Sequence, residues 1–359
     1  MKFKGRNIFF ITTTIFLFLS LASCSSSETE KISSTQETEV SSTSSQPESI
    51  TSSDNSQSAS AIPVEEVDPV IPEPIPILPV TVIDHIGNTV TINSVERIIP
   101  LDGSVAEVVF ALNLGDNVVA TDRSATWPPE ATELPQIGYQ RSLLAESIAG
   151  FAPTILIGTE IAGPEKTLED LRRLGYPVVI VPSESTMQGP ADKIRAVAEA
   201  LGVPNRGEEL AATLENSIAA NTQMIDEQRR PIVAALYIRG TGTQLVLGRN
   251  SATHWLINAA GGKNVADILD IDQYKTITAE SLLRAEPDIL LVPSAGLDSV
   301  GGIDGLLEVG GISQTPAGIN RAVLAYDDQL LLGNGPRTGD LLEQLVKDFQ
   351  AIAMQIENN

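Results

Sequence analysis

Several residue types that build common functional sites are scarce in this chain of 359 residues. It contains one cysteine, two histidines and 4% aromatic residues. A single cysteine excludes a disulfide scaffold, a zinc finger and a cysteine-ligated cluster. Two histidines leave few ligands for a zinc or manganese site and few general bases for an enzyme. With 23 lysines and arginines against 46 acidic residues, the chain also lacks the basic surface that nucleic-acid binding requires.

The N-terminus has the pattern of an export signal with a lipid-attachment site. Three basic residues within the first six positions precede an apolar stretch over residues 8–21, which is short for a membrane span. The stretch ends in Leu-Ala-Ser followed by Cys24, and this box resembles the lipobox of bacterial lipoproteins. The resemblance implies a signal peptide over residues 1–23, lipidation of Cys24 and membrane anchoring at the extracytoplasmic face of the cell envelope.

The composition of residues 24–79 predicts a disordered tether. Serine, threonine and glutamate dominate the first part, and six prolines follow between residues 63 and 79. Such a segment buries too little apolar surface to offset the entropy lost on ordering, and its proline-rich end should be extended. We expect this tether to hold a folded body away from the membrane.

The body from residue 80 onward has the alternating pattern of an α/β fold. Ser104 and Glu107 form a capping-box pattern, which predicts the start of a helix that runs through Leu112. A longer helical pattern covers about residues 190–229 and is interrupted near residues 202–204. Five short apolar runs predict buried strands at residues 97–100, 154–157, 178–181, 232–236 and 288–292. The alternation predicts parallel sheets in two lobes, with a ligand cleft between them.

An internal repeat supports the two-lobe interpretation. Ala-Glu-Ser at residues 145–147 recurs at residues 279–281, and the strand that follows each copy recurs at the same offset of 134 residues. We therefore predict a first lobe over residues 80–186, a connecting helix over residues 187–230 and a second lobe over residues 231–359.

Five further stretches carry a resemblance to a known family, and they are residues 101–107, 134–141, 296–306, 314–318 and 332–338. Together with the tether and the repeat, they resemble the substrate-binding proteins of ABC importers for iron chelates and cobalamin. The haem-binding branch, of the HmuT type, is the most similar. The resemblance covers about residues 80–350 and implies the periplasmic-binding-protein fold, with two Rossmann-like lobes joined by a long helix. It also implies a monomer without catalytic residues or a catalytic cofactor, which carries haem b to an ABC permease and its ATPase.

Two Tyr-x-Arg pairs are the candidate iron ligands. A phenolate oxygen suits ferric iron, and tyrosine is a known axial ligand of haem. The resemblance implies that the residue at Tyr139 ligates the iron, and Tyr237 is the candidate second ligand, at the end of a predicted strand. Residues two apart in an extended segment point to the same side, so Arg141 and Arg239 could each favour a phenolate beside them. Packing without ligation is the alternative for both tyrosines.

Three further residues are candidates for the haem pocket. Arg337 could pair with a haem propionate, or it could simply begin a helix. His254 could approach the iron, although a single histidine in a helix also serves as a packing residue. Tyr326 is a weaker candidate, as is Tyr274. His85 lies in a predicted hairpin turn, and we expect it to be structural.

The repeat also places one acidic residue at the same point of each lobe. The family resemblance implies that Glu146 and Glu280 dock onto arginines of the membrane permease. Acidic residues near helix starts also interact favourably with the helix dipole, which is the structural alternative.

Two other functions remain open at the level of the sequence. A cobalamin or ferric-siderophore binder of the same fold would not require a pair of tyrosines. A surface-anchored enzyme belongs to a different class, but the chain has no Gly-x-Ser-x-Gly elbow, phosphate loop or His-Glu metal motif.

Overall fold

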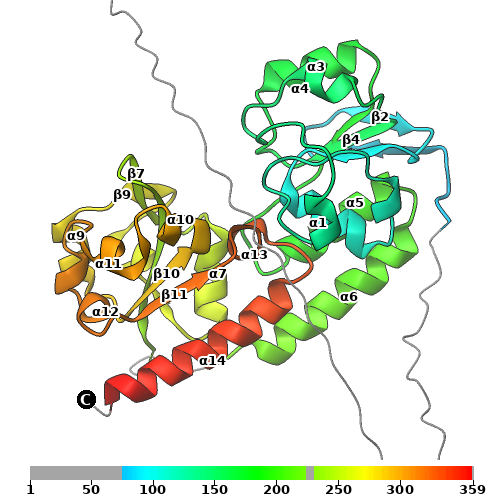
Figure 1. The fold of residues 1–359 in the computed structure, drawn as a ribbon. Coiled ribbons are helices and arrows are strands. Elements are labelled where there is room, and N and C mark those ends of the chain that lie inside the picture. Colours follow the sequence, from blue (N-terminus) through cyan, green and yellow to red (C-terminus); the bar gives the residue numbers. More distant parts are fainter. Residues whose placement is uncertain (1–74, 224–229, 358–359) are drawn as a thin grey trace, which may run out of the picture. The chain divides into compact units, whose positions relative to one another are not determined.

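The computed structural model describes residues 75–223 and 230–357, so Cys24 and most of the predicted tether lie outside the described residues. In the first lobe, three parallel strands form a sheet in the order β3-β4-β5, and β1 and β2 form a separate antiparallel ribbon (Figure 1). Every residue of β3, β4 and β5 is buried, as expected for a parallel sheet covered on both faces. The elements of this lobe are β1 (Val80–Ile83), β2 (Thr89–Ile92), β3 (Ile98–Pro100), α1 (Gly103–Ala111), η1 (Gly115–Asn117), α2 (Pro129–Thr132), α3 (Ala145–Ala149), β4 (Ile155–Gly158), α4 (Glu165–Arg173) and β5 (Val178–Ile180).

The second lobe contains a larger mixed sheet. Its strand order is β11-β10-β6-β7-β9, and β8 pairs with the beginning of β6. The strands β11, β10 and β6 are parallel, whereas β7 and β9 add an antiparallel extension. The elements of this lobe are β6 (Ile232–Arg239), β7 (Thr243–Leu247), α7 (Ala252–Ala259), β8 (Lys263–Asn264), α8 (Val265–Leu269), β9 (Tyr274–Thr276), α9 (Ala279–Ala285), β10 (Ile289–Pro293), α10 (Ser294–Asp298), α11 (Gly302–Leu307), η3 (Ile312–Gln314), α12 (Pro316–Ile319) and β11 (Val323–Tyr326).

Two helices occupy the predicted connecting stretch. They are α5 (Gly189–Ala200) and α6 (Pro204–Asn221), and the break between them falls at the predicted interruption. Gly202 adopts a positive φ of 72°, which a residue with a side chain would resist, and Pro204 then starts the next helix. After the second lobe the chain continues through α13 (Asp328–Gly333) into α14 (Thr338–Glu357), and α14 packs along α6 (Figure 1).

The structure confirms the internal repeat. Helix α3 begins at Ala145 and α9 at Ala279, while β4 begins at Ile155 and β10 at Ile289. Both pairs of elements are therefore 134 residues apart, as the sequence predicts. In each lobe the repeated strand pairs in parallel with the first strand of that lobe's parallel sheet, β3 or β6.

The predicted capping box at the start of α1 is wrong. The N-cap is Asp102, whose carboxylate accepts a hydrogen bond from the Val105 amide at 3.1 Å. Ser104 lies inside the helix and donates from its hydroxyl to Asp102 at 2.6 Å. Glu107 is turned to an ion pair with Arg337 instead of capping the helix. Asp102, two positions before Ser104, caps the helix because aspartate is as good an N-cap residue as serine. The partner of Glu107, Arg337, lies 230 residues away along the chain.

One hydrophobic cluster continues from the first lobe into the second. It includes Val105 of α1, Leu214 of α6, Val233 of β6 and Phe349 of α14, all of them buried. Separate clusters fill the outer parts of each lobe. Burial of this shared cluster is the main physical reason why α6 and α14 hold the two lobes together. In the described part of the chain, no helix is both long and apolar enough to cross a bilayer.

Candidate functional site

The end of strand β6 presents Tyr237 and Arg239 on one side of the sheet. Alternate residues of a strand point the same way, and the Arg239 guanidinium carbon lies 4.4 Å from the centroid of the Tyr237 ring. This is the geometry of a cation–π contact, and both side chains are half-buried. The predicted strand-end Tyr-x-Arg pair is thus a real side-by-side arrangement.

The second pair, Tyr139 and Arg141, lies in an irregular loop between α2 and α3. Tyr139 is half-buried and Arg141 is exposed. Both are near enough to Tyr237 to act electrostatically on the pKa of its phenol. The fold therefore brings together four residues that the sequence predicts for one site, although the two pairs are about a hundred positions apart. Within the described residues, neither phenol hydroxyl has a hydrogen-bond partner in the protein.

The pKa of the Tyr237 phenol is raised above its usual value near 10. Burial is the largest cause, and Tyr139 and Asp328 raise it further, whereas Arg239 and Arg141 oppose the rise. At neutral pH the free phenol is consequently protonated. A ligand that requires the phenolate has to displace a proton, and the two arginines stabilise the charged form once it exists.

Asp328 is a site residue that sequence reasoning missed. It is the first residue of α13, and its carboxylate forms an ion pair with Arg239. It also accepts a hydrogen bond from the Ala295 amide at 3.2 Å. Burial raises the pKa of Asp328, and the positive charge of Arg239 lowers it. No local pattern could have identified this residue, because 89 positions separate it from Arg239.

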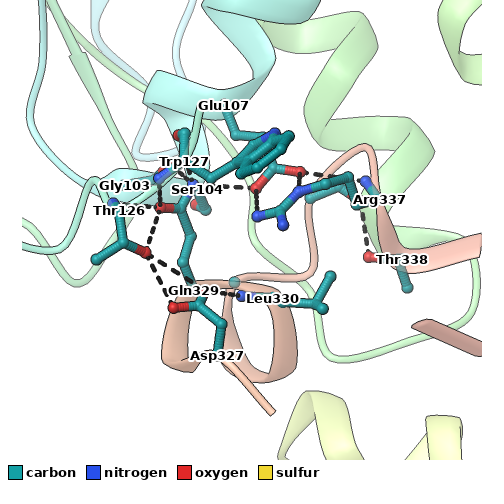
Figure 2. Close-up of polar contacts among 12 residues, drawn as sticks. Gly103, Ser104, Glu107, Thr126, Trp127, Asp327, Gln329, Leu330, Arg337 and Thr338 are labelled. Carbon is teal, nitrogen blue, oxygen red and sulfur yellow. Dashed lines mark hydrogen bonds and ion pairs between the residues drawn. The ribbon is translucent and has the colours of Figure 1, made fainter. Parts of the chain in front are cut away.

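Next to Asp328, the side chain of Gln329 joins α13 to the first lobe (Figure 2). Its amide nitrogen donates to the carbonyl oxygens of Gly103 at 2.8 Å and Trp127 at 3.1 Å, and to the Glu107 carboxylate at 3.0 Å. Its amide oxygen accepts from the backbone of Thr126 at 2.7 Å and of Trp127 at 2.9 Å. With the Thr126 hydroxyl, which donates to the same oxygen at 3.2 Å, this buried amide makes six hydrogen bonds and fixes its segment firmly. Helix α13 therefore connects the first lobe, through Gln329, to Arg239 of the second lobe, through Asp328.

Arg337 is engaged inside the protein. Its Nε and Nη2 atoms donate to the two carboxylate oxygens of Glu107, each at 3.0 Å, and its guanidinium carbon lies 4.6 Å from the Trp127 ring centroid (Figure 2). These three residues line a shallow pocket of about 350 Å³ that includes neither tyrosine. The role predicted for Arg337, pairing with a propionate, would require it to exchange this partner.

Comparison with known proteins identifies the family. A family model described as periplasmic binding protein matches residues 98–330. The chain belongs to the periplasmic binding protein family. It is a binding protein and not an enzyme, and its fold is the two-lobed α/β fold of that family.

Two solved structures and one curated relative illustrate how this periplasmic binding protein compares with others. The periplasmic haem-binding protein RhuT from Roseiflexus sp. RS-1, in its apo form, is 47% identical, with 72% of this chain and 99% of that chain covered and a TM-score of 0.69. The haem-binding protein HmuT is 33% identical, covers 80% of this chain and 94% of its own, and has a TM-score of 0.72. A vitamin B12-binding protein from Vibrio parahaemolyticus is 21% identical over 258 residues, which is 72% of this chain and 90% of the relative.

The remaining pocket candidates of this periplasmic binding protein have partners elsewhere. His254 Nε2 lies 2.9 Å from an Asp267 carboxylate oxygen, and the Asn258 amide nitrogen lies 3.3 Å from the same ring atom. The Tyr326 hydroxyl donates to Asp348 of α14, and burial together with this carboxylate raises the pKa of the phenol. A place for either residue in the ligand pocket stays a prediction.

His85 and Tyr274 occupy positions of a structural kind. His85 Nε2 lies 3.2 Å from Glu160, which fits the structural role expected for it. The Tyr274 side chain, on strand β9, is 63% exposed. Across residues 75–223 and 230–357, no group of three or more histidine, cysteine, aspartate or glutamate side chains could hold a metal ion.

The two repeated glutamates occupy equivalent places in this periplasmic binding protein. Glu146 lies in the first turn of α3 and Glu280 in the first turn of α9. Both are exposed, and neither forms an ion pair with any described residue. The geometry leaves both carboxylates available to a partner.

Proposed function

We propose that this protein captures haem at the extracytoplasmic face of the cell envelope and delivers it to an ABC permease with its ATPase. The observation that carries the proposal is the convergence of Tyr139 and Tyr237, neither of whose phenol hydroxyls is bonded to the described protein, with Arg239 stacked on Tyr237 and Arg141 two positions from Tyr139. The 47% identity to a haem-binding protein over almost its whole length supports the same ligand.

The chemistry of the two phenols fits ferric haem. Ferric iron is a hard cation that binds phenolate oxygen strongly, and its charge displaces the phenol proton on binding. Arg239, held above the Tyr237 ring, stabilises the resulting negative charge. Capture and release then need no bond chemistry beyond ligation and one proton transfer for each ligating phenol.

Arg141 is the arginine best placed to meet a haem propionate. It is exposed and makes no ion pair with the described residues, whereas Arg239 is paired with Asp328 and Arg337 with Glu107. A guanidinium without an internal partner binds a carboxylate without first breaking another ion pair. Arg141 also offsets, at the site, the excess of negative charge that the whole chain carries.

The setting outside the cytoplasm completes the proposal. Cleavage before Cys24 would leave a lipidated first residue, and residues 24–79 would form the tether between membrane and binding body. The protein would work as a monomer that carries haem b. Glu146 and Glu280 would contact the permease, one on each lobe.

Cobalamin is the second candidate ligand, because vitamin B12-binding proteins are among the relatives of this chain. The vitamin B12-binding protein from Vibrio parahaemolyticus is 21% identical to this chain, whereas the two haem-binding proteins are 47% and 33% identical to it. Cobalamin would also leave the paired phenols without a role.

The deciding experiment is a titration of the purified protein with ferric haemin, followed in the visible spectrum. We expect saturable binding with a shifted Soret band, and loss of the tyrosinate-ligation spectrum when Tyr139→Phe and Tyr237→Phe are combined. Tyr274→Phe, which changes an exposed phenol, is the matched control. The absence of saturable binding to haemin, together with saturable binding of cyanocobalamin, would replace the first candidate by the second.

A further inference from the structure

The first lobe contains a fully buried carboxylate that no part of the proposed haem chemistry uses. Asp122 has no solvent exposure. One of its oxygens accepts hydrogen bonds from the Ser124 amide at 3.0 Å and the Gln140 amide at 3.2 Å, and the other accepts from the Ser124 hydroxyl at 2.8 Å. Burying a carboxylate is expensive even with such partners, and burial raises the pKa of Asp122 to about 7. Buried groups with strongly shifted pKa values are concentrated at functional sites, so Asp122 is a candidate for a functional role.

One of these three bonds reaches the loop that carries Tyr139. Residues 138–142 lie outside every helix and strand, so few backbone contacts define their position. The Gly138 carbonyl accepts from the Arg123 amide and the Gln140 carbonyl accepts from the Gly163 amide, each at 2.8 Å. Among the described residues, Asp122 is the one side chain from outside the loop that bonds to its backbone. Its partner, Gln140, directly follows Tyr139.

The other bonds of Asp122 lead toward Tyr237. The Ser124 hydroxyl accepts from the Gly103 amide at 2.9 Å, at the start of α1. Two residues after Ser124, the Thr126 amide donates to Gln329 at 2.7 Å. The residue before Gln329 is Asp328, which pairs with the guanidinium stacked on Tyr237. A chain of hydrogen bonds and short covalent steps thus links the two tyrosine-bearing segments.

We propose that Asp122 is a positioning residue that holds the loop of Tyr139 in register with Tyr237, so that both phenols face one ligand. The proposal rests on the proposed haem function. Asp122 itself touches neither tyrosine and makes no contact with the ligand. It acts through the Gln140 amide, and a merely structural carboxylate would stabilise the lobe without affecting Tyr139 selectively.

The first test measures amide hydrogen exchange in the purified protein without haem, at a pH above 7 where the Asp122 carboxylate is ionised. Asp122→Ala should accelerate exchange in residues 138–142 by roughly ten- to a hundredfold, as expected when one hydrogen bond to a charged group is lost. Asp122→Asn keeps a neutral hydrogen-bond acceptor, so it should accelerate amide exchange in the same loop by a smaller factor. If Asp122→Ala does not fold, the comparison of Asp122→Asn with wild type is the test.

Asp288 provides a matched control in the second lobe. It is a half-buried aspartate whose carboxylate accepts a hydrogen bond from the Ile232 amide at 2.8 Å. Asp288→Ala should accelerate exchange at the beginning of β6 and leave residues 138–142 unchanged. Equal exchange of this loop in wild type, Asp122→Asn and Asp122→Ala would overturn the proposal.

The second test uses the haem spectrum of the same variants. Asp122→Ala should give the same haem spectrum and the same loss of haem affinity as Tyr139→Phe. The double variant should bind haem no more weakly than Tyr139→Phe alone. Asp288→Ala should keep the wild-type spectrum. A fully wild-type haem spectrum in Asp122→Ala would overturn the proposal. If the wild-type protein binds no haem, the proposed function fails, and the exchange experiment still decides whether Asp122 positions the loop.

Discussion

Glu107 and Arg337, which are 230 positions apart in the sequence, form a bidentate ion pair. The Glu107 side chain is 5% exposed, and it also accepts from the Arg337 amide at 3.2 Å and from Gln329 at 3.0 Å. Arg337 directly precedes α14, so this pair fixes the start of the last helix against α1. The contact joins α1, the first helix of the described chain, to α14, the last one.

Loss of this ion pair should destabilise the protein substantially. Arg337→Ala leaves a buried carboxylate without its cation, which typically costs about 3 kcal/mol or more of the free energy of unfolding. Arg206→Ala, which removes an arginine paired with exposed Glu209, should cost less than about 1 kcal/mol. Urea denaturation of the three proteins measures both differences. A large loss of haem affinity at unchanged stability would instead assign Arg337 to a propionate.

Asp328 should control the acidity of Tyr237. The carboxylate raises the pKa of the phenol and engages Arg239, which lowers it. Asp328→Asn should therefore lower the pKa of Tyr237, and phenolate absorbance should develop at lower pH in an ultraviolet titration. Haem affinity should rise in parallel, because less work is needed to remove the proton. The control is Asp298→Asn, an exposed aspartate of the same lobe. An unchanged titration would show that Arg239 acts independently of its ion pair.

Asp122 should make stability fall as pH rises. Its pKa is about 7 in the folded protein, whereas an aspartate in an unfolded chain titrates near 4. Between these values the folded state keeps a proton that the unfolded state has released, so the free energy of unfolding decreases with pH, by up to about 1.4 kcal/mol per pH unit, and levels off above pH 7. Asp122→Asn lacks this dependence. Its stability relative to wild type should rise between about pH 4 and 7 in denaturant titrations, and a constant difference would contradict the buried-carboxylate interpretation.

The two repeated glutamates should matter for transport and not for binding. Combining Glu146→Gln with Glu280→Gln should reduce haem uptake by cells at least about tenfold, since each lobe loses the charge proposed to meet the permease. Haem titrations of the purified variant should match wild type. Glu96→Gln with Glu308→Gln, one exposed glutamate in each lobe, is the control and should leave uptake unchanged. Uptake that persists in the first double variant would remove these residues from the docking surface.

Local sequence patterns determined the repeat and the class of fold. Short apolar runs located β3, β4, β5, β6 and β10, because a strand buried on both faces requires consecutive apolar residues. The offset of 134 residues anticipated the equivalence of α3 with α9 and of β4 with β10. The Tyr-x-Arg spacing predicted that Tyr237 and Arg239 lie on one side of the strand, since neighbours two apart point the same way, and the structure then shows the two side chains stacked.

Only the tertiary structure decided which polar groups meet. The capping pattern of Ser104 and Glu107 failed because Asp102 caps α1 and Glu107 has a distant partner, Arg337. Hydrogen bonds and ion pairs act over a few ångströms regardless of separation along the chain, so sequence spacing carries no record of them. For the same reason the sequence alone named Tyr139 and Tyr237 but gave no sign of Asp122, Asp328 and Gln329. These three residues connect the two tyrosine-bearing segments, and folding alone places them there.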